Sequence, residues 1–215
     1  LMYASISKNV LLAIPYFILA GVLMEYAGIS KRLIRLAEVC VGHIRGGLAY
    51  VVIIVACFFA AISGSGPATV AALGGILIPA MEKNGYEKNM SAALVAASGG
   101  IGVIIPPSIA FVIFAMYAEI SVGKLFICGI IPGIFLGMMY AIAAAWSIRK
   151  NKNIVQSKKS TAREKIDALK EAFWGLMTPF IILGGIYTGI FTATEAAGVA
   201  VVYSLFVGIF IYKEI

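Results

Sequence analysis

Residues 46–81 contain no Asp, Glu, Lys or Arg, yet this run is too long for one membrane-spanning helix and too short for two. As a single helix it would extend about 54 Å, whereas the hydrocarbon core of a bilayer is about 30 Å thick and two full spans need about 40 residues plus a turn. The sequence ISGSGPATVAALGG, residues 62–75, interrupts the run near its middle. We therefore expect a re-entrant helical hairpin that enters the membrane over residues 48–62, turns at Ser63–Pro67 and leaves on the same side over residues 67–81.

The composition of the whole chain is that of an integral membrane protein. Hydrophobic residues make up 61% of the chain, charged residues make up 13%, and the mean hydropathy is +0.99. Soluble domains carry about 25% charged residues. Other uncharged runs that are long enough, or nearly so, to cross a bilayer lie at 9–24, 89–118, 125–148, 172–194 and 196–212. We therefore predict an all-α membrane fold with several spans.

The formal net charge of +7 is not spread evenly, because basic residues are concentrated in two stretches, residues 29–47 and 149–171. Basic residues beside apolar spans fit positive-inside placement better than a nucleic-acid site, so we expect both stretches on the cytoplasmic side. Within them, residues 29–41 and 161–174 place apolar residues on one helical face and charged residues on the other. This pattern is typical of helices that lie along the lipid headgroups.

Two helix starts are marked by capping boxes, in which a Thr and a Glu three residues later bond to each other's backbone N–H groups. Thr161 with Glu164 opens the second amphipathic stretch, and Thr192 with Glu195 opens the last apolar run. A carboxylate beside a membrane span also suggests a transport role. The spacing of Glu195 from Thr192 favours the capping interpretation.

The uncharged run 89–118 is interrupted as well. The sequence SGGIG at residues 98–102 loosens a helix there, and Pro106–Pro107 removes two backbone donors and adds ring clashes. We expect two half-helices, over residues 90–99 and about 107–117, with an unwound segment between them.

Two such breaks in consecutive segments, both beside serines, favour a transport site. Non-helical backbone survives at membrane depth only where it is buried in protein or lines a watery cavity. Freed carbonyl oxygens can hold a monovalent cation there, and the N-termini of half-helices attract anions. A single break would be explained more simply as a kink that eases helix packing. The candidate oxygens are the hydroxyls of Ser63, Ser65 and Thr69 and the carbonyls near Gly102, Ile105 and Pro106.

A resemblance to a known family is carried by four segments: FFAAISGSGPATVAALGGILIPAMEKNGY, SGGIGVIIPPSIAFVIF, SVGKLFICGIIPG and PFIILGGIYTGIFTATEAAGVAVVYSL. From about Ile14 to the last residue, the chain resembles the large membrane (M) subunit of tripartite ATP-independent periplasmic (TRAP) transporters. The resemblance implies an elevator-type secondary transporter of the ion-transporter superfamily in the bacterial inner membrane. Its expected parts are a re-entrant hairpin, a broken transmembrane helix and interfacial arm helices.

The same resemblance implies the substrate and the partners. It implies sodium-coupled uptake of an organic anion, commonly a C4-dicarboxylate or sialic acid, which a periplasmic substrate-binding (P) protein delivers. A small membrane (Q) subunit would brace the scaffold in the lipid bilayer. Na⁺ is the implied coupling ion, with no other cofactor, no nucleic-acid partner and no enzymatic activity. The broken segments lack carboxylates, which agrees with sodium rather than proton coupling.

Carried over residue by residue, the resemblance assigns the hairpin tip to one half of a sodium site and the unwound segment to the other. The expected sodium-binding residues are Ser63, Ser65, Gly66, Gly102, Ile105 and Pro106. The expected substrate-binding residues are Ser65, Pro67, Thr69, Pro107 and Ser108. The family often has a serine where this chain has Gly66, so only the backbone is expected to contribute at that position.

The resemblance also divides the chain into six segments. They are a scaffold helix with an arm helix over 1–45, the re-entrant hairpin over 46–88, the broken helix over 89–118, a transmembrane helix over 119–150, a basic cytoplasmic linker with the second arm helix over 151–175, and scaffold helices over 176–215. The family's membrane domain is about twice this length and holds two inverted repeats. We therefore expect the chain to contain the first repeat and the start of the second, and not to transport alone.

Four other functions fit the residues less well. An anion symporter of the same superfamily that needs no binding protein would share the hairpin, and so would a channel-like protein whose re-entrant loop lines a pore. Saturation of flux at low substrate would separate a carrier from a channel. A purely structural membrane subunit stays open if the second repeat holds all the chemistry. An intramembrane enzyme would need His, Lys or Asp to activate Ser63 or Ser65, and their spans contain none.

Overall fold

A computed structural model describes the chain over residues 9–149, 154–155 and 159–215. Within these ranges every regular element is a helix, as predicted from the apolar runs. Among the described residues, four stretches are long and apolar enough to cross a membrane: Asn9–Tyr26, Val122–Ile148, Ala162–Tyr187 and Ala193–Tyr212. In chain order the elements are η1 (Asn9–Leu12), α2 (Ala13–Tyr26), α3 (Ile29–Val41), α4 (Gly47–Ser63), α5 (Gly66–Lys83), α6 (Lys88–Gly99), η2 (Gly100–Val103), α7 (Ile109–Ala118), α8 (Val122–Ile148), α9 (Ala162–Tyr187), α10 (Ala193–Phe206) and the π-helix η3 (Val207–Tyr212).

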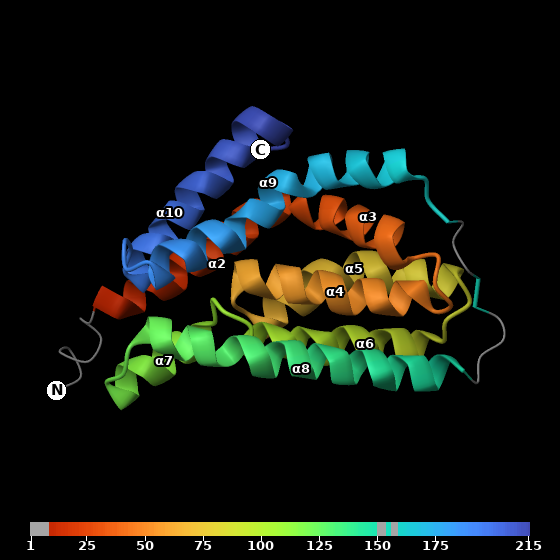
Figure 1. Ribbon diagram of the computed structural model, residues 1–215, viewed down its shortest axis with the longest axis horizontal. Coiled ribbons are helices and arrows are strands. Elements are labelled where there is room, and N and C mark those ends of the chain that lie inside the picture. The colour runs from red at the N-terminus through yellow and green to blue at the C-terminus, as the bar shows by residue number, and fades with distance from the viewer. Residues whose placement is uncertain (1–8, 150–153, 156–158) are drawn as a thin grey trace.

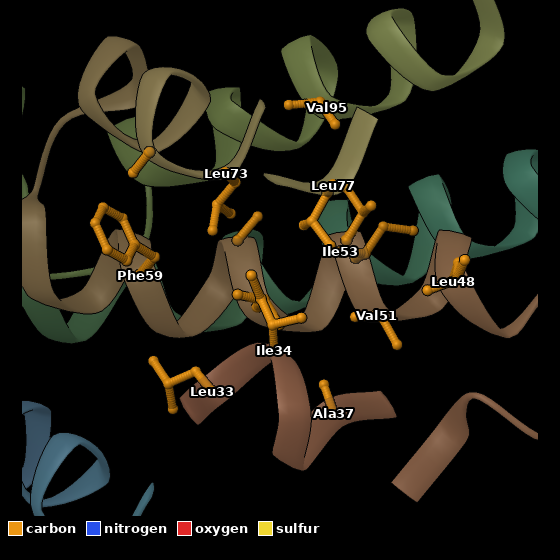
Figure 2. Packing of buried hydrophobic residues seen from close by; sticks show 14 of the residues in the cluster. Leu33, Ile34, Ala37, Leu48, Val51, Ile53, Phe59, Leu73, Leu77 and Val95 are labelled. Carbon is orange, nitrogen blue, oxygen red and sulfur yellow. The ribbon is translucent and has the colours of Figure 1, made fainter. Parts of the chain in front are cut away.

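Helix α4 lies at the centre of the molecule and packs against α3, α5, α6 and α8 (Figure 1). Its sequence, GLAYVVIIVACFFAAIS, is apolar on every side, which is typical of a helix that is buried all round. Figure 2 shows α4 between α3, with Leu33 and Ala37, on one side and α5 and α6, with Leu77 and Val95, on the other. The hairpin of α4 and α5 is therefore held inside the largest buried cluster of the described chain.

A second and smaller core joins α2 to α10. Ala13, Phe17 and Ala20 of α2 are buried in one cluster with Ala197 and Ala200 of α10. Small residues let two helices approach closely where lipid supplies no hydrophobic driving force. In Figure 1, α2, α9 and α10 form a group that diverges from the layer of α4, α5, α6 and α8.

Both amphipathic stretches are helical, but the second does not end where predicted. Helix α9 runs unbroken from Ala162 to Tyr187, so the predicted helix 161–174 and the following span are one element. The switch from an amphipathic to a uniformly apolar sequence reflects a change in the environment of the helix. The backbone can stay helical across such a change. Pro179, inside α9, lacks the N–H that would bond the carbonyl of Gly175. A proline is the usual cause of a kink, and α9 changes direction near its middle (Figure 1).

The two capping boxes are confirmed. The Thr161 N–H donates to Glu164 Oε2 at 2.8 Å, and Thr161 Oγ1 accepts the Glu164 N–H at 3.4 Å. The Thr192 N–H donates to Glu195 Oε2 at 2.8 Å, and Thr192 Oγ1 accepts the Glu195 N–H at 3.3 Å. These bonds fix the first residues of α9 and α10, and they account for the position of Glu195.

Candidate functional site

The hairpin of α4 and α5 turns at Gly64 and Ser65, inside the predicted turn. Helix α4 ends because Gly64 adopts a left-handed φ of 61°, which glycine reaches without a Cβ clash. Ser65 is extended and caps α5, since its Oγ accepts the N–H of Ala68 at 3.5 Å. Pro67 lies in the first turn of α5, where a helix has no use for its missing N–H.

A small cluster of oxygen atoms lies directly below this turn. The hydroxyl oxygens of Ser63 and Thr69 are 3.3 Å apart, and both residues are buried, with 3% and 1% of their surface exposed. Thr69 Oγ1 also donates to the carbonyl of Ser65 at 2.9 Å. Two consecutive helices therefore place three neutral oxygens side by side.

The second break lies between α6 and α7. Helix α6 tightens into the 3₁₀ turn η2, and residues 104–108 are not helical before α7 begins at Ile109. Ser108 Oγ donates to the carbonyl of Val103 at 2.6 Å and accepts the N–H of Phe111 at 3.3 Å, which caps α7. No N–H or O–H group of the described residues bonds to the carbonyl oxygens of Gly102, Ile105 or Pro106.

The hairpin tip and the second break touch each other. The Ile109 N–H, the first of α7, donates to the carbonyl of Gly64 at 3.1 Å. A Cβ atom added to Gly102 would lie 3.3 Å from the nitrogen of Gly66, and one added to Gly66 would lie 2.9 Å from the carbonyl oxygen of Gly99. The two backbones therefore meet without intervening side chains. A side chain at position 66 would require the broken helix to shift.

The structure brings part of the predicted site together. Ser63, Ser65, Gly66 and Thr69 of the hairpin lie at this contact, and Gly102 of the break faces them. The two prolines of the break are buried. The carbonyl of Pro107 approaches Gly64, since a Cβ there would lie 2.7 Å from that oxygen.

Other predicted site residues turn their side chains away or are already engaged. The side chain of Ile105 packs against Gly133 of α8, and Pro106 lines an apolar groove of about 580 Å³ between α4, α8 and α9. Pro67 is exposed. The Ser108 hydroxyl is fully buried and both of its bonds serve the backbone. The site can therefore use the main-chain atoms of Ile105, Pro106 and Ser108, and not their side chains.

Three glycines outside the predicted residue set also shape the site. Gly64 supplies the turn and the bond to Ile109, and Gly99 admits the backbone of Gly66. Gly21 of α2 packs against the tip, where a Cβ would lie 3.1 Å from Ser63 Cβ. Gly64 and Gly99 lie within motifs that sequence reasoning had identified. Gly21 sits in an ordinary apolar span, and only its tertiary neighbour gives it a role.

Charged groups lie outside the contact itself. Its polar atoms are hydroxyl and carbonyl oxygens. Between α2 and the tip lies a hollow of about 130 Å³ that Ser63, Ser65 and Glu25 help to line. Among the residues that the structure describes, no three His, Cys, Asp or Glu side chains form a group able to hold a metal ion. The arrangement suits a weakly held monovalent cation, because divalent cations favour carboxylate ligands.

Comparison with known proteins gives one family. The model of the family described as "Tripartite ATP-independent periplasmic transporter, DctM component" matches residues 1–215. The C4-dicarboxylate TRAP transporter large permease protein DctM of Pseudomonas aeruginosa is 47% identical over 204 residues. The isethionate TRAP transporter permease protein DctMQ of Oleidesulfovibrio alaskensis is 47% identical over 213 residues. The sialic acid TRAP transporter permease protein SiaT of Haemophilus influenzae is 38% identical over 211 residues.

The similarity covers nearly all of this chain and only part of each relative. The aligned residues are 95% of this chain and 48% of the Pseudomonas protein. They are 99% of this chain and 34% of the Oleidesulfovibrio protein, and 98% and 34% for the Haemophilus protein. The chain thus spans about half, or about a third, of the length of the curated relatives it matches.

Proposed function

The chain belongs to the DctM-component family of tripartite ATP-independent periplasmic transporters, and from this membership we propose that it forms part of a sodium-coupled elevator for an organic anion. Relatives are named for C4-dicarboxylates, isethionate and sialic acid, and we place the substrate of this chain in the same class of organic acids. The observation that carries the proposal is the contact between the hairpin tip and the broken helix. Main-chain oxygens without a hydrogen-bond partner among the described residues lie at that break.

The proposed cation site is made from both breaks. In the described part of the chain, no backbone N–H bonds to the carbonyl oxygens of Gly102, Ile105 and Pro106. Ser63 and Ser65 add oxygens from the hairpin. Freed carbonyls at broken membrane helices are typical ligands of Na⁺. A bound cation would draw the tip and the break together, since each supplies only part of the ligand set. This dependence of the closed tip on sodium is the proposed basis of coupling.

The proposed anion site uses the two helix starts beside it. Helix α5 begins next to Ser65 and Pro67, with the buried Thr69 in its first turn, and α7 begins after Pro107 and Ser108. Each N-terminus carries the positive end of a helix dipole and can hold a carboxylate. The hydrogen bond between Ile109 and Gly64 lies between these two starts. The anion and the cation would therefore bind close to each other and stabilise each other's charge.

The remaining elements take the other parts of an elevator. We assign the hairpin α4–α5, re-entrant from the cytoplasmic side, and the broken helix α6–α7 to the moving transport domain. The scaffold would comprise α2, the second half of α9 and α10, while α3 and the first half of α9 act as arms. A small membrane subunit would brace the scaffold, and a periplasmic binding protein would deliver the substrate. Transport, rather than catalysis, is the proposed activity.

Sodium binding to the complete transporter tests the proposal. The melting temperature of the purified protein is measured in sodium chloride against choline chloride at equal ionic strength, and it should rise with sodium. Ser63→Ala removes one ligand-bearing hydroxyl and should raise the sodium concentration for half-maximal stabilisation about two- to tenfold, the equivalent of about 0.5–1.5 kcal/mol.

The matched control is Ser91→Ala, which removes a fully buried hydroxyl from the other end of α6. It should leave the sodium titration unchanged. A parent protein that sodium does not stabilise would contradict the proposed coupling. An unchanged titration in Ser63→Ala would contradict the role of that side chain.

A further inference from the structure

Two hollows lie end to end along helix α2, between this helix and the hairpin. The smaller hollow, of about 130 Å³, reaches Ser63 and Ser65 at the hairpin tip. The larger hollow, of about 520 Å³, lies at the elbow between α2 and α3 and extends to Ile76 of α5. Both hollows are lined by Val22 and Glu25. Their shared lining places them next to each other, between the proposed cation site and the end of α2.

Glu25 is the carboxylate common to both hollows. It is exposed, and its side chain makes no hydrogen bond or ion pair with any residue in the described part of the chain. It follows Gly21 by about one helical turn, a rise of about 6 Å, and Gly21 packs directly against Ser63. An unpaired negative charge therefore lies about one turn from the hairpin tip.

Ser30, at the start of α3, indicates that the larger hollow is wet. Its side chain lines the hollow, only 3% of its surface is exposed, and its Oγ has no partner among the described residues. A buried hydroxyl without a partner is unfavourable, so a water molecule or a cation in the hollow is expected to supply one. The hollow is large enough to hold several waters.

We propose that these two hollows form a cation-selective aqueous route between the hairpin tip and the membrane surface at α3, with Glu25 as the residue that attracts the cation. This inference deepens the proposed function, on which it rests for the identity of the cation and for the cytoplasmic side of the membrane. Glu25 acts as a transient partner along the route. The ligands at the tip hold the cation.

Lys31 explains why the route does not bind a cation too tightly. Lys31 lines the larger hollow together with Glu25, and the two side chains form no ion pair within 4 Å. The carboxylate raises the local concentration of cations, and the ammonium group lowers it again toward the surface. The electrostatic energy minimum for a cation in the route is therefore shallow. A shallow minimum allows the cation to be released repeatedly. Neutralising one charge should have the opposite effect to neutralising the other.

Thiol labelling at the tip measures the charge selectivity of the route. Ala68 is exposed and lines the smaller hollow, and Ala68→Cys is placed in the complete transporter with Cys40, Cys57 and Cys128 replaced by alanine. Inside-out vesicles are treated with a trimethylammonium methanethiosulfonate or with its sulfonate counterpart. Each rate is divided by the rate with free mercaptoethanol, and the cation-to-anion ratio is compared between variants.

The ratio should exceed one in the Ala68→Cys parent. Glu25→Gln should lower it about three- to tenfold, and Lys31→Gln should raise it by a similar factor, within the range of electrostatic focusing by protein charges. Glu82→Gln neutralises an exposed carboxylate at the end of α5 that lines neither hollow, and it should change nothing.

An unchanged ratio in Glu25→Gln overturns the inference, and so does the absence of labelling in inside-out vesicles. The sodium titration of the parent judges the proposed function separately. Charge-selective labelling in a protein that sodium does not stabilise would reject sodium coupling and support the route. If sodium stabilises the protein but the labelling ratio does not depend on the charge of the reagent, the route is rejected and the proposed function is not.

Discussion

Three glycines set how closely the hairpin tip approaches the broken helix. Gly66 lies against Gly99, and Gly102 lies against the nitrogen of Gly66 and the carbonyl group of Ser65. The atoms nearest to Gly102, and the single nearest atom to Gly66, belong to the backbone, so they cannot move aside as the end of a flexible side chain can. At this scale the proposed site depends on the absence of three methyl groups.

Gly102→Ala should therefore loosen the contact. The added Cβ would lie 3.3 Å from backbone atoms of Ser65 and Gly66, and overpacking of this kind costs about 1–3 kcal/mol. We expect a lower melting temperature and weaker stabilisation by sodium. Gly75→Ala is the control, because a Cβ there meets nothing within 4 Å, and an alanine in a helix should stabilise α5 by about 0.5–1 kcal/mol. Equal behaviour of the two variants would show that close approach at Gly102 is unimportant.

At the scale of single elements, the break between α6 and α7 makes the sharpest prediction. In the double variant Pro106→Ala, Pro107→Ala, the N–H restored at position 106 can bond the carbonyl of Gly102 four residues earlier. The Ile105 carbonyl would pair in the same way with the N–H of Ile109, which now bonds Gly64. Sodium stabilisation should fall sharply while the protein still folds, because a continuous helix is favourable in lipid.

Pro79→Ala is the matched control for that double variant. Pro79 lies inside α5, which continues through it as a helix, and it is exposed. Its replacement should leave sodium stabilisation unchanged. If sodium stabilises the double variant as much as the parent, the broken helix has only an architectural role. If the double variant loses expression and stability but keeps sodium affinity, the prolines act through packing.

The sequence predicts the breaks well because their causes are local. Gly64, Pro67 and the Pro106–Pro107 pair act through their own φ angles and missing donors, and α4, α5, α6 and α7 begin and end within a few residues of the predicted bounds. The direction in which a side chain points, and whether a helix continues past a change in composition, depend on tertiary contacts. Neither was predictable from the sequence. Ile105 turns away because Gly133 of α8 leaves space for it, and α9 continues because the rest of the chain covers its buried face.

On the scale of the whole molecule, this chain is a multi-pass protein of the bacterial inner membrane. The amphipathic helix α3 is tied to the C-terminal region and to α9 by side-chain contacts. Arg32 pairs with Glu214 at 2.7 Å and lies 3.8 Å above the ring of Tyr212, while Arg35 pairs with Glu171 of α9. Exposed ion pairs contribute only about 0–1 kcal/mol each, so these contacts add little to the free energy of folding.

The proposed re-entrant topology predicts where two labels react. The arms α4 and α5 are antiparallel, so Arg45 before α4 and Lys83 at the end of α5 lie at the same end of the hairpin. Each arm is about 26 Å long, short of a full crossing of about 30 Å. In a background without native cysteines, Arg45→Cys and Lys83→Cys should both react with an impermeant maleimide from the cytoplasmic side only. Reaction of either from the periplasm would overturn this topology.

The carbonyl oxygens at the break between α6 and α7 also affect how the proposed ion site responds to mutation. The break depends on what its residues lack, because the glycines have no side chain and the prolines have no amide hydrogen. Apart from the Ser63 and Ser65 hydroxyls, the proposed ligands are main-chain carbonyl oxygens, which a single substitution does not remove. Side chains around the two helix starts are meanwhile free to drift toward a new cargo. With the proposed sites, a lineage can change its anion by substitution and keep the carbonyl oxygens proposed to hold the cation.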